Sequence, residues 1–555
     1  MNIPYKHVSL SASFVFLGLC GPGIQGMDAA GAEGRPNILW ITCEDMSPRL
    51  GAYGDEVART PRLDTFFSNA VRYDNAYAVT GVCAPNRSCL ITGMYPTSYG
   101  AQHMRTLRRT SSIDQITDPQ LLAIPTYEAV PPAEAKTVSE LLRRAGYYTT
   151  NNKKTDYQFT TPVTAWDENS GTAHWRNRPD QNQPFFSVFN IVETHESRVW
   201  RHADLPLLVS PEDIEVPPYY PDNEVVRRDM AVHYSNIARM DAIAGNILDQ
   251  LEEDGLAEST IIFFFSDHGD GLPRMKRWTY DSGIHVPFGV RFPDGNRAGE
   301  TTDRLVSFVD FAPTVLSLAG IPVPDFMMGK PFLGEQESEP RDYVYASHDR
   351  MDPSLHCIRT VRENRYKYIR NHMPQRPYVQ FLPYRDQMPL MQEILEMRDK
   401  GTGNEIQRLW LADRKPPEEL YDLNEDPHEI NNLAKDPRMR EVKDRLSAAL
   451  DRWMERTGDP LTMPEPELIK KLWPPDGVQP ETEPVRFREE NGFLILESAT
   501  NGASIAYQSN GSIGGSHWDL YTGPIPVRNV DTIKALAVRI GYRESAPRQY
   551  ALKEK

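Results

Sequence analysis

Four short, mainly apolar runs of the kind found in buried strands occur in the first half of the chain. Polar or ionisable residues follow each of them. The runs are Ile38–Ile41, Ala145–Thr150, Pro184–Val192 and Thr260–Phe265. Runs of this length without regular polar alternation are typical of strands buried on both faces, as in a parallel sheet covered by helices. The pattern therefore predicts four strands of one buried sheet.

A helical pattern separates the third run from the fourth. Apolar residues recur every three or four positions from Pro221 to Leu251, with Asp222 as the predicted N-cap and Gly255 as the stop signal. Strands that alternate with helical segments predict an α/β fold with a doubly wound, mostly parallel sheet. In such a sheet the carboxyl ends of the strands face one crevice, where binding and catalytic sites lie.

The residues that follow the four runs are expected to meet in this crevice. They are Glu44, Asp45, Lys154, His195, Asp267 and His268. Carboxylates gathered with cations favour a hard metal ion and an anionic substrate. Each residue also has a simpler interpretation, because adjacent carboxylates are often solvated loop charges, and a single lysine or histidine is often a surface group or a satisfied hydrogen-bonding partner.

The pattern of predicted elements changes twice after the predicted α/β domain, which covers residues 33–341. Alternating strands from about Asp342 predict a smaller antiparallel α+β subdomain over residues 342–472. A linker rich in proline and glutamate follows at 473–484. Residues 485–555 contain short strands separated by glycine, asparagine and serine turns, which predicts an independent C-terminal β-sandwich.

The amino terminus and the overall charge limit where the protein works and what it binds. Residues 1–32 have the pattern of an export signal peptide, with Lys6 ahead of the apolar run Val8–Leu19. Because this run is too short for a permanent membrane helix, we expect an exported protein, periplasmic or extracellular, with no integral membrane segment after signal removal. The formal net charge of −16 argues against a nucleic-acid partner.

The stretch from Val82 to Gly93 carries the most specific candidate chemistry. Pro85 fits the first turn of a helix without loss of a hydrogen bond, which places Cys83 at a helix N-terminus, where free N–H groups favour an anion. Arg87, four residues on, lies on the same face and can reach back to the group that Cys83 carries or attracts. A buried cysteine followed by a surface arginine is the simpler alternative.

This stretch resembles the signature of the type I sulfatases, carried here by Cys83, Pro85, Arg87, Leu90, Thr92 and Gly93. In that family a maturation enzyme oxidises the cysteine to formylglycine, whose hydrate is the nucleophile. The resemblance covers about residues 36–460 and implies an alkaline-phosphatase-like fold. Asn86 stands where the family usually has serine or alanine.

The resemblance also implies a metal site. Glu44 and Asp45 match the paired acidic ligands of the family, although the first of these is usually aspartate, and Asp267 matches a further ligand. His268 stands where asparagine is more common. With the modified Cys83, these residues would hold Ca²⁺, or Mg²⁺ as the second choice, because both cations prefer oxygen ligands.

The remaining catalytic groups follow from the same resemblance. Lys154 and Lys276 match two lysines that contact the sulfate group, and His195 matches the histidine that protonates the leaving group. The family commonly has a histidine two residues after the first lysine, but this chain has Asp156. The base for the last step is therefore either Asp156 or His103.

These roles imply a complete mechanism. One hydroxyl of the formylglycine hydrate, held by the metal and Arg87, attacks sulfur in line with the leaving group. Lys154, Lys276 and the metal balance the charge on the sulfate oxygens, while His195 donates a proton to the departing alcohol or amine. The second hydroxyl then loses its proton, sulfate is eliminated and the aldehyde returns.

A basic cluster, at odds with the acidic whole, is expected to form a substrate-binding rim made of His103, Arg105, Arg108 and Arg109. Segments 217–222 and 420–434 resemble the heparan N-sulfatases, which implies a sulfated saccharide substrate, with N-sulfated glucosamine first and O-sulfated sugars second. Residues 485–555 resemble the C-terminal β-sandwich module of hexosaminidases.

Two alternatives remain open. Relatives of this fold cleave phosphoryl esters, so a phosphatase or phosphonate monoester hydrolase fits a similar site. A catalytically silent glycan-binding protein that uses residues 485–555 is the second alternative, against which the intact Cys83, Arg87 and Lys154 argue.

Overall fold

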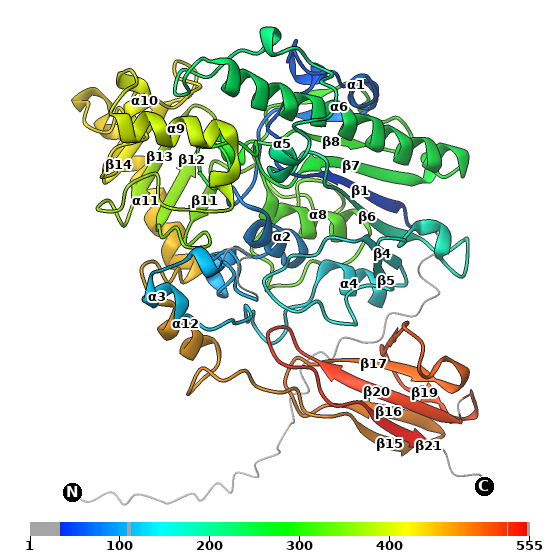
Figure 1. Cartoon of the computed structure of the whole chain (residues 1–555). Helices are drawn as coiled ribbons and strands as arrows, with labels where there is room; N and C mark the ends of the chain where they lie inside the picture. The colour runs from blue at the N-terminus through cyan, green and yellow to red at the C-terminus, as the bar shows by residue number, and fades with distance from the viewer. Residues whose placement is uncertain (1–33, 108–112, 530, 552–555) are drawn as a thin grey trace, which may run out of the picture.

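The computed structural model describes residues 34–107, 113–529 and 531–551, so the expected signal peptide lies outside the described residues. An eight-stranded sheet forms the centre of the described chain, in the order β5-β4-β6-β1-β7-β8-β2-β9 (Figure 1). Its four parallel central strands match the four predicted runs: β4 (Tyr148–Asn152), β6 (Phe185–Ile191), β1 (Asn37–Cys43) and β7 (Thr260–Ser266). The predicted mostly parallel α/β sheet is confirmed.

The edges of the sheet add shorter strands. On one side β5 (Glu168–Ser170) continues the parallel arrangement. On the other side β8 (Phe288–Arg291) runs antiparallel to β7 and to β2 (Val71–Tyr73), and β9 (Thr301–Thr302) follows β2. The sheet is therefore mixed only at this edge.

Successive residues of each central strand pack on opposite faces of the sheet. In β1, Ile38 and Trp40 join one core and Leu39 and Ile41 join the other. The first core also contains residues of α2 (Cys83–Thr92), α4 (Val138–Arg144) and α8 (Phe311–Leu318), and the second contains residues of α1 (Pro61–Ser68) and α6 (Glu224–Glu253). Figure 1 shows these two helical layers on either side of the sheet. Burial on both faces explains why the strands lack polar alternation.

Helix α6 begins one residue later than its predicted N-cap implies. Asn223 is the N-cap, and its side chain accepts a hydrogen bond from the backbone N–H of Val226 at 3.0 Å. Asp222 instead forms an ion pair with Arg227 at 2.5 Å. The prediction of Asp222 as the N-cap is therefore wrong by one residue. Aspartate and asparagine both cap helices well, and the helical pattern alone does not choose between two such residues side by side.

The subdomain that follows has the predicted antiparallel sheet, in the order β11 (Val344–His348), β12 (Ile358–Arg362), β13 (Tyr366–Asn371) and β14 (Glu418–Asp422). Helix α11 (Arg440–Thr457) packs against β12 and β13. Three further helices complete this region: α9 (Pro389–Lys400), α10 (Glu405–Leu409) and α12 (Glu465–Leu472).

The C-terminal residues form two small antiparallel sheets. One contains β15 (Arg486–Glu490), β16 (Phe493–Glu497) and β19 (Ile525–Pro526), and the other contains β18 (Asp519–Leu520), β17 (Ser504–Ser509), β20 (Thr532–Val538) and β21 (Arg548–Ala551). Their shared core includes Leu494 and Leu496 from the first sheet and Ile505 and Ile533 from the second. This arrangement is a sandwich with its own core.

The sandwich is also fixed to the α/β domain by buried contacts. Glu140 of α4, 2% exposed, accepts a hydrogen bond from Ser504 Oγ at 2.5 Å. Arg143 of the same helix donates to the carbonyl of Trp518 at 2.9 Å, and Ile540 joins the core on that side of the large sheet. Helix α4 leads directly into β4, so the sandwich is fixed to the segment that carries the strand ending just before Lys154. The C-terminal residues have their own core, as expected for a module, but they are packed against the α/β domain.

Among the residues that the structure describes, no helix combines the length and the apolar character that crossing a bilayer requires.

The docked sandwich leads to a stability prediction. Gly502 has a φ of +73°, and a Cβ at this position would lie 1.8 Å from the carbonyl oxygen of Ala133 in the α/β domain. We therefore expect Gly502→Val to lower the free energy of unfolding by about 2 kcal/mol or more, measured as a lower unfolding temperature in calorimetry. Gly492→Val is the matched control, because Gly492 has a similar φ of +81° and no atom lies within 4 Å of its Cβ position. Equal unfolding temperatures for the two variants would contradict this docking.

Candidate active site

Helix α2 places its first residue at the carboxyl end of the large sheet. Val82, the N-cap, has extended backbone angles, and Cys83 begins the helix with only 2% of its surface exposed. Arg87 lies one turn further on and is 5% exposed. The predicted position of the cysteine at a helix N-terminus is therefore what the backbone shows, and both side chains are buried at the crevice.

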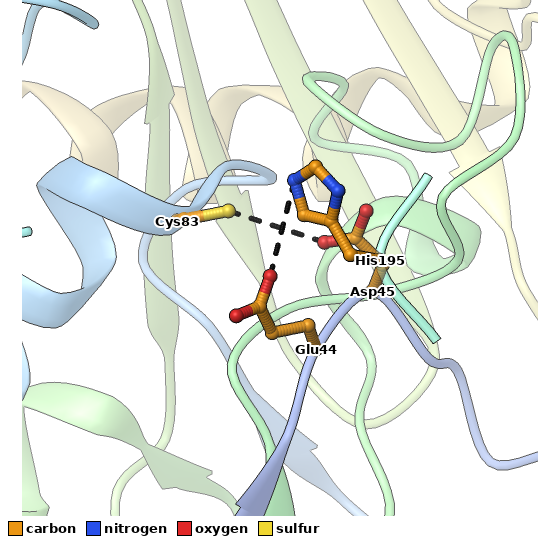
Figure 2. Close-up of side chains that lie close together, drawn as sticks. All are labelled: Glu44, Asp45, Cys83 and His195. Carbon is orange, nitrogen blue, oxygen red and sulfur yellow. Dashed lines mark hydrogen bonds and ion pairs between the residues drawn. The ribbon is translucent and has the colours of Figure 1, made fainter. Parts of the chain in front are cut away.

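The Cys83 sulfur lies among charged groups. Its Sγ is 3.4 Å from His268 Nε2, 3.8 Å from Lys276 Nζ and 3.9 Å from Asp45 Oδ1. Burial alone would raise the pKa of the Cys83 thiol, but the charges of Lys154 and Lys276 lower it to about 6. Figure 2 shows the cysteine pointing toward Asp45. The position therefore favours an anionic group at residue 83.

Asp45 lies at the centre of this charge cluster. Its backbone has a φ of +50°, directly after β1, and its side chain is fully buried. Oδ2 pairs with Lys276 Nζ and accepts the backbone N–H of Glu196 at 2.7 Å, while Oδ1 is 2.9 Å from His268 Nε2. Burial would raise the pKa of Asp45, yet Lys276 and His268 hold it well below its usual range. The carboxyl group is therefore ionised at neutral pH.

A second set of ion pairs joins Glu44, Arg87 and Asp267. Glu44 Oε1 is 2.8 Å from Lys154 Nζ and 3.9 Å from Arg87 Nη2. Arg87 Nη2 is also 3.0 Å from Asp267 Oδ2, and Asp267 Oδ1 accepts the backbone N–H of Asp45 at 3.1 Å. Arg87 therefore faces the two flanking carboxylates and neutralises part of their charge.

His195 lies at the open side of the cluster. Its Nε2 is 3.8 Å from Glu44 Oε2. Figure 2 marks this contact with a dashed line. Its Nδ1 accepts the backbone N–H of Ser197 at 3.2 Å, which puts the proton of the neutral ring on Nε2. The imidazole therefore presents an N–H donor to the crevice.

The acidic groups fit a hard metal ion. Ligand atoms of Glu44, Asp45, Cys83 and His195 lie within 4.8 Å of one another, and so do those of Asp45, Cys83, Asp267 and His268. Carboxylate oxygens are the ligands that Ca²⁺ and Mg²⁺ prefer. His268 is the atypical member, because imidazole nitrogen suits these cations poorly. Here it is a cation itself: burial would lower the pKa of His268, but Asp267 and Asp45 raise it to about 10.

Three residues that support this cluster, Glu196, Arg277 and Asn190, are absent from the candidates predicted from the sequence. Glu196, buried to 2% exposure, is paired with both Lys276 at 3.3 Å and Arg277 at 2.6 Å. Asn190, at the end of β6, accepts a hydrogen bond from Arg87 Nη1 at 2.5 Å. Asn190 lies within the predicted strand Pro184–Val192, so a polar residue in an apolar run was a usable signal, whereas the pairing of Glu196 with Arg277 depends on residues about eighty positions apart.

The remaining predicted residues fall into two groups. Asp156 lies two residues after Lys154, and Arg105 Nη1 is 3.9 Å from its Oδ1. Both line a hollow of about 300 Å³ together with residues 157–161. Arg108 and Arg109 lie outside the described residues. The hollow therefore contains Arg105, the described arginine among the three predicted for the substrate rim, and it adjoins the segment that follows Lys154.

His103 lies in a different, buried setting. It is 6% exposed, and its Nδ1 accepts the backbone N–H of Arg350 at 3.2 Å. Arg350 in turn forms a buried ion pair with Glu465 of α12. Burial lowers the pKa of His103 to about 4, against the opposing charge of Glu465. The structure does not bring His103 into contact with the described residues of the charge cluster.

Comparison with family models agrees with this geometry. The sulfatase model matches residues 36–182 and 177–321, and the model described as N-sulphoglucosamine sulphohydrolase, C-terminal, matches residues 274–394. An ulvan-active sulfatase of Formosa agariphila is 42% identical, covering 92% of this chain and 90% of its own length. The N-sulphoglucosamine sulphohydrolase of Homo sapiens is 26% identical, covering 83% of this chain and 96% of its own length.

Solved structures share the fold. A protein solved in complex with its substrate D-glucosamine-2-N,6-O-disulfate superimposes with a TM-score of 0.53 at 18% identity, covering 78% of this chain and 99% of that one. The phosphonate monoester hydrolase of Agrobacterium radiobacter gives a TM-score of 0.52 at 18% identity, covering 77% and 97%. At these identities the likeness shows the alkaline-phosphatase-like fold alone.

The buried His103 predicts a specific pH dependence of stability. Its pKa of about 4 lies below the value of about 6.5 for an unfolded histidine, so the unfolded chain binds the extra proton between these values. Stability contributed by the neutral ring is therefore full above about pH 6.5 and is lost as the pH falls toward 4. We expect His103→Asn, which keeps an acceptor for the N–H of Arg350, to reduce this acid loss by about 2 kcal/mol in denaturant titrations. Parallel pH curves for the two proteins would contradict this account.

Proposed function

The chain belongs to the sulfatase family, and on that premise we propose that it releases sulfate from a sulfated glycan at the crevice around Cys83. The observation that carries the proposal is the position of Cys83, at a helix N-terminus and 3.8 Å from the Lys276 ammonium, beside the carboxylate cluster. An enzyme that transfers an anionic group needs both a nucleophile and fixed positive charge at this point. Chance clustering of these residue types is not expected to reproduce the order of the family motifs.

Residue 83 is the proposed nucleophile position. The formylglycine that sulfatases form from this cysteine would supply a hydroxyl for attack on sulfur. Lys276 Nζ lies 3.8 Å from the Cys83 sulfur, and the charges of Lys276 and Lys154 both lower the pKa of the Cys83 thiol. We propose that the two ammonium groups hold the sulfate oxygens and that Arg87 keeps Asp267 oriented through its 3.0 Å contact.

We propose that Glu44, Asp45 and Asp267 would hold a divalent cation, with Ca²⁺ as the first choice and Mg²⁺ as the second. His268, which was also expected as a ligand, is protonated beside Asp45 and Asp267 and would join them only after it loses its proton. Such a cation would supply positive charge for the sulfate oxygens. The three carboxylates suit it because they are oxygen donors and are buried together. Asp45 and Cys83 belong to both groups of ligand atoms, so Asp45 is the carboxylate that the two groups share.

His195 is the proposed general acid. Its Nε2–H faces the crevice, and the hydrogen bond from the Ser197 N–H to Nδ1 fixes this orientation. For the base of the final step we propose Asp156 in preference to His103. Asp156 lines the hollow beside Lys154, whereas His103 is 6% exposed and bonded to Arg350.

The substrate proposal follows the more similar relative. A protein 42% identical over 92% of this chain is named an ulvan-active sulfatase, and the N-sulphoglucosamine sulphohydrolase is 26% identical. We therefore propose ulvan as the first polysaccharide to test and N-sulfated glucosamine, which the sequence motifs place first, as the second. Arg105 at the rim would pair with a further anionic group of the glycan.

Location and maturation are proposed on the sequence pattern. Residues 1–32 favour export to the periplasm or the outside of the cell, where polysaccharides are met. A formylglycine-generating enzyme is the expected maturation partner. The sandwich module, residues 485–555, is proposed to brace the catalytic domain, which reduces the case for a purely glycan-binding protein.

Sulfate release from ulvan oligosaccharides and from N- and O-sulfated glucosamine tests the substrate proposal. Aryl sulfate and aryl phosphate, assayed with the same preparation, test the reaction class. We expect turnover of aryl sulfate to exceed that of aryl phosphate, because the buried carboxylates offset part of the charge of Lys154 and Lys276, and a monoanionic sulfate requires less positive charge than a dianionic phosphate. Faster turnover of aryl phosphate would favour the phosphatase alternative.

The role of His195 predicts an effect that depends on the leaving group. His195→Asn is expected to lower the turnover of sugar sulfates by roughly 10²–10⁴-fold, because an alcohol leaves poorly without a proton. Turnover of a nitrophenyl sulfate is expected to fall much less, because its leaving group is stable as an anion. Equal losses on both substrates would contradict a general-acid role.

The metal proposal predicts a loss of bound ion. Asp45→Asn and Asp267→Asn are each expected to reduce the Ca²⁺ bound per chain, measured by elemental analysis, together with turnover. Glu425→Gln, at an exposed position, is the control and should keep the wild-type content. Full activity after prolonged dialysis against a chelator would argue against the metal.

A further inference from the structure

A second cavity lies away from the active site, between the α/β domain and the antiparallel subdomain. It has a volume of about 210 Å³ and is lined in part by α10 and β14, which lie together at one side of Figure 1. We call it the aromatic cup and define it by Tyr219, Arg274, Tyr280, Tyr378, Trp410, Arg414 and Tyr421. Among the described residues that line it, none belongs to the charge cluster around Cys83.

The wall of the cup consists of aromatic rings, and three of them are held by hydrogen bonds to a carboxylate that does not line the cup. The hydroxyls of Tyr280, Tyr378 and Tyr421 donate to the buried carboxylate of Glu419 at 3.1, 3.0 and 2.7 Å. Because these hydroxyls are already bonded, the rings keep one orientation. A fixed aromatic wall offers contact area to a flat ligand at little entropic cost.

Positive charge at the cup is only partly compensated. Arg274 lies between two rings, with its guanidinium carbon 4.2 Å from the centre of Tyr219 and 4.3 Å from that of Tyr280. It donates from Nη2 to the carbonyl of Glu429 at 2.7 Å, although a guanidinium has five N–H donors. Arg414 lies exposed at the rim, and no ion pair joins it to a described residue.

The carboxylate that lines the cup does not cancel this charge. Glu429 Oε1 is 2.8 Å from Lys367 Nζ, and its Oε2 accepts the backbone N–H of Asp281 at 2.6 Å. The cup therefore favours an anion that also presents a flat face for packing. The volume is below the roughly 300–1,000 Å³ of pockets for drug-sized ligands, which suits a single ring.

We propose that the aromatic cup is a second, non-catalytic binding site for one anionic sugar unit, carrying a sulfate or a carboxylate group. The sugar ring packs against the tyrosine wall, and its anionic group pairs with Arg274 and Arg414. The inference rests on the proposed function only for the kind of polymer that supplies the sugar. Such a site would hold a glycan chain on the enzyme while another part of the chain enters the crevice.

The cup and the crevice share one turn of the chain. Arg274 has a φ of +60° and lies two residues before Lys276, whose backbone N–H bonds to the carbonyl of Leu272 at 3.0 Å. The turn therefore presents Arg274 to the cup and Lys276 to the cluster around Cys83. A ligand that fixes Arg274 also fixes the segment that carries Lys276.

The test counts binding sites by titration calorimetry on full-length Cys83→Ala protein, which does not turn over its ligand. The probes are glucosamine 6-sulfate and glucuronate, with N-acetylglucosamine as the neutral control. We expect Arg414→Gln to weaken the cup site by roughly tenfold or more and Arg414→Lys to change it only slightly. Lys154→Ala, in contrast, should remove only the crevice site.

The outcomes separate the two proposals. Binding of one or both anionic probes that is lost in Arg414→Gln and kept in Lys154→Ala supports the cup, and the probe that binds names the group. Identical isotherms for the protein with Arg414 and for Arg414→Gln would overturn it. If the Cys83→Ala protein shows the cup site but no crevice site, and the enzyme that retains Cys83 releases no sulfate, the proposed function is contradicted while the cup stands. In the enzyme that retains Cys83, Arg414→Gln should leave the turnover of a nitrophenyl sulfate unchanged.

Discussion

The balance of charge around Asp45 is the constraint on which the crevice depends. A carboxylate that is fully buried is costly unless cations and hydrogen-bond donors compensate it. Here Lys276 and His268 supply the charge, and the backbone N–H of Glu196 supplies a further donor. The same two side chains lie 3.8 and 3.4 Å from the Cys83 sulfur, so the groups that stabilise Asp45 also prepare the position of the nucleophile.

The fold explains how this cluster forms without a dedicated loop. Asp45 and Asp267 follow the adjacent parallel strands β1 and β7, whose ends lie side by side in the sheet. Helix α2 approaches from the layer of α4 and α8 and brings Cys83 and Arg87 to that edge. A parallel sheet thus converts positions that are more than two hundred residues apart into one site.

Much of this arrangement could be predicted from the sequence because it depends on local patterns. The four strands follow from their apolar runs, and the residues of the crevice follow from the ends of those strands. Cys83 and Arg87 follow from a helix start that Pro85 marks. The N-cap of α6 was placed one residue too early, since Asp222 and Asn223 are both suitable caps.

What the sequence could not predict depends on contacts between distant segments. The pairing of Glu196 with Arg277, the bonds from Ser504 to Glu140 and the convergence of three tyrosines on Glu419 have no periodic signal. His103 is a related case, because no pattern in its local sequence predicts its burial beside Arg350 and Glu465. Tertiary packing alone decides whether such residues serve the site, the fold or a second surface.

The most direct measurement of the central claim is the mass of the proteolytic peptide that contains residue 83, taken from enzyme that releases sulfate. The account predicts a peptide in which the thiol side chain of Cys83 is replaced by the aldehyde of formylglycine or its hydrate. An unmodified cysteine at position 83 in a fully active preparation would contradict it.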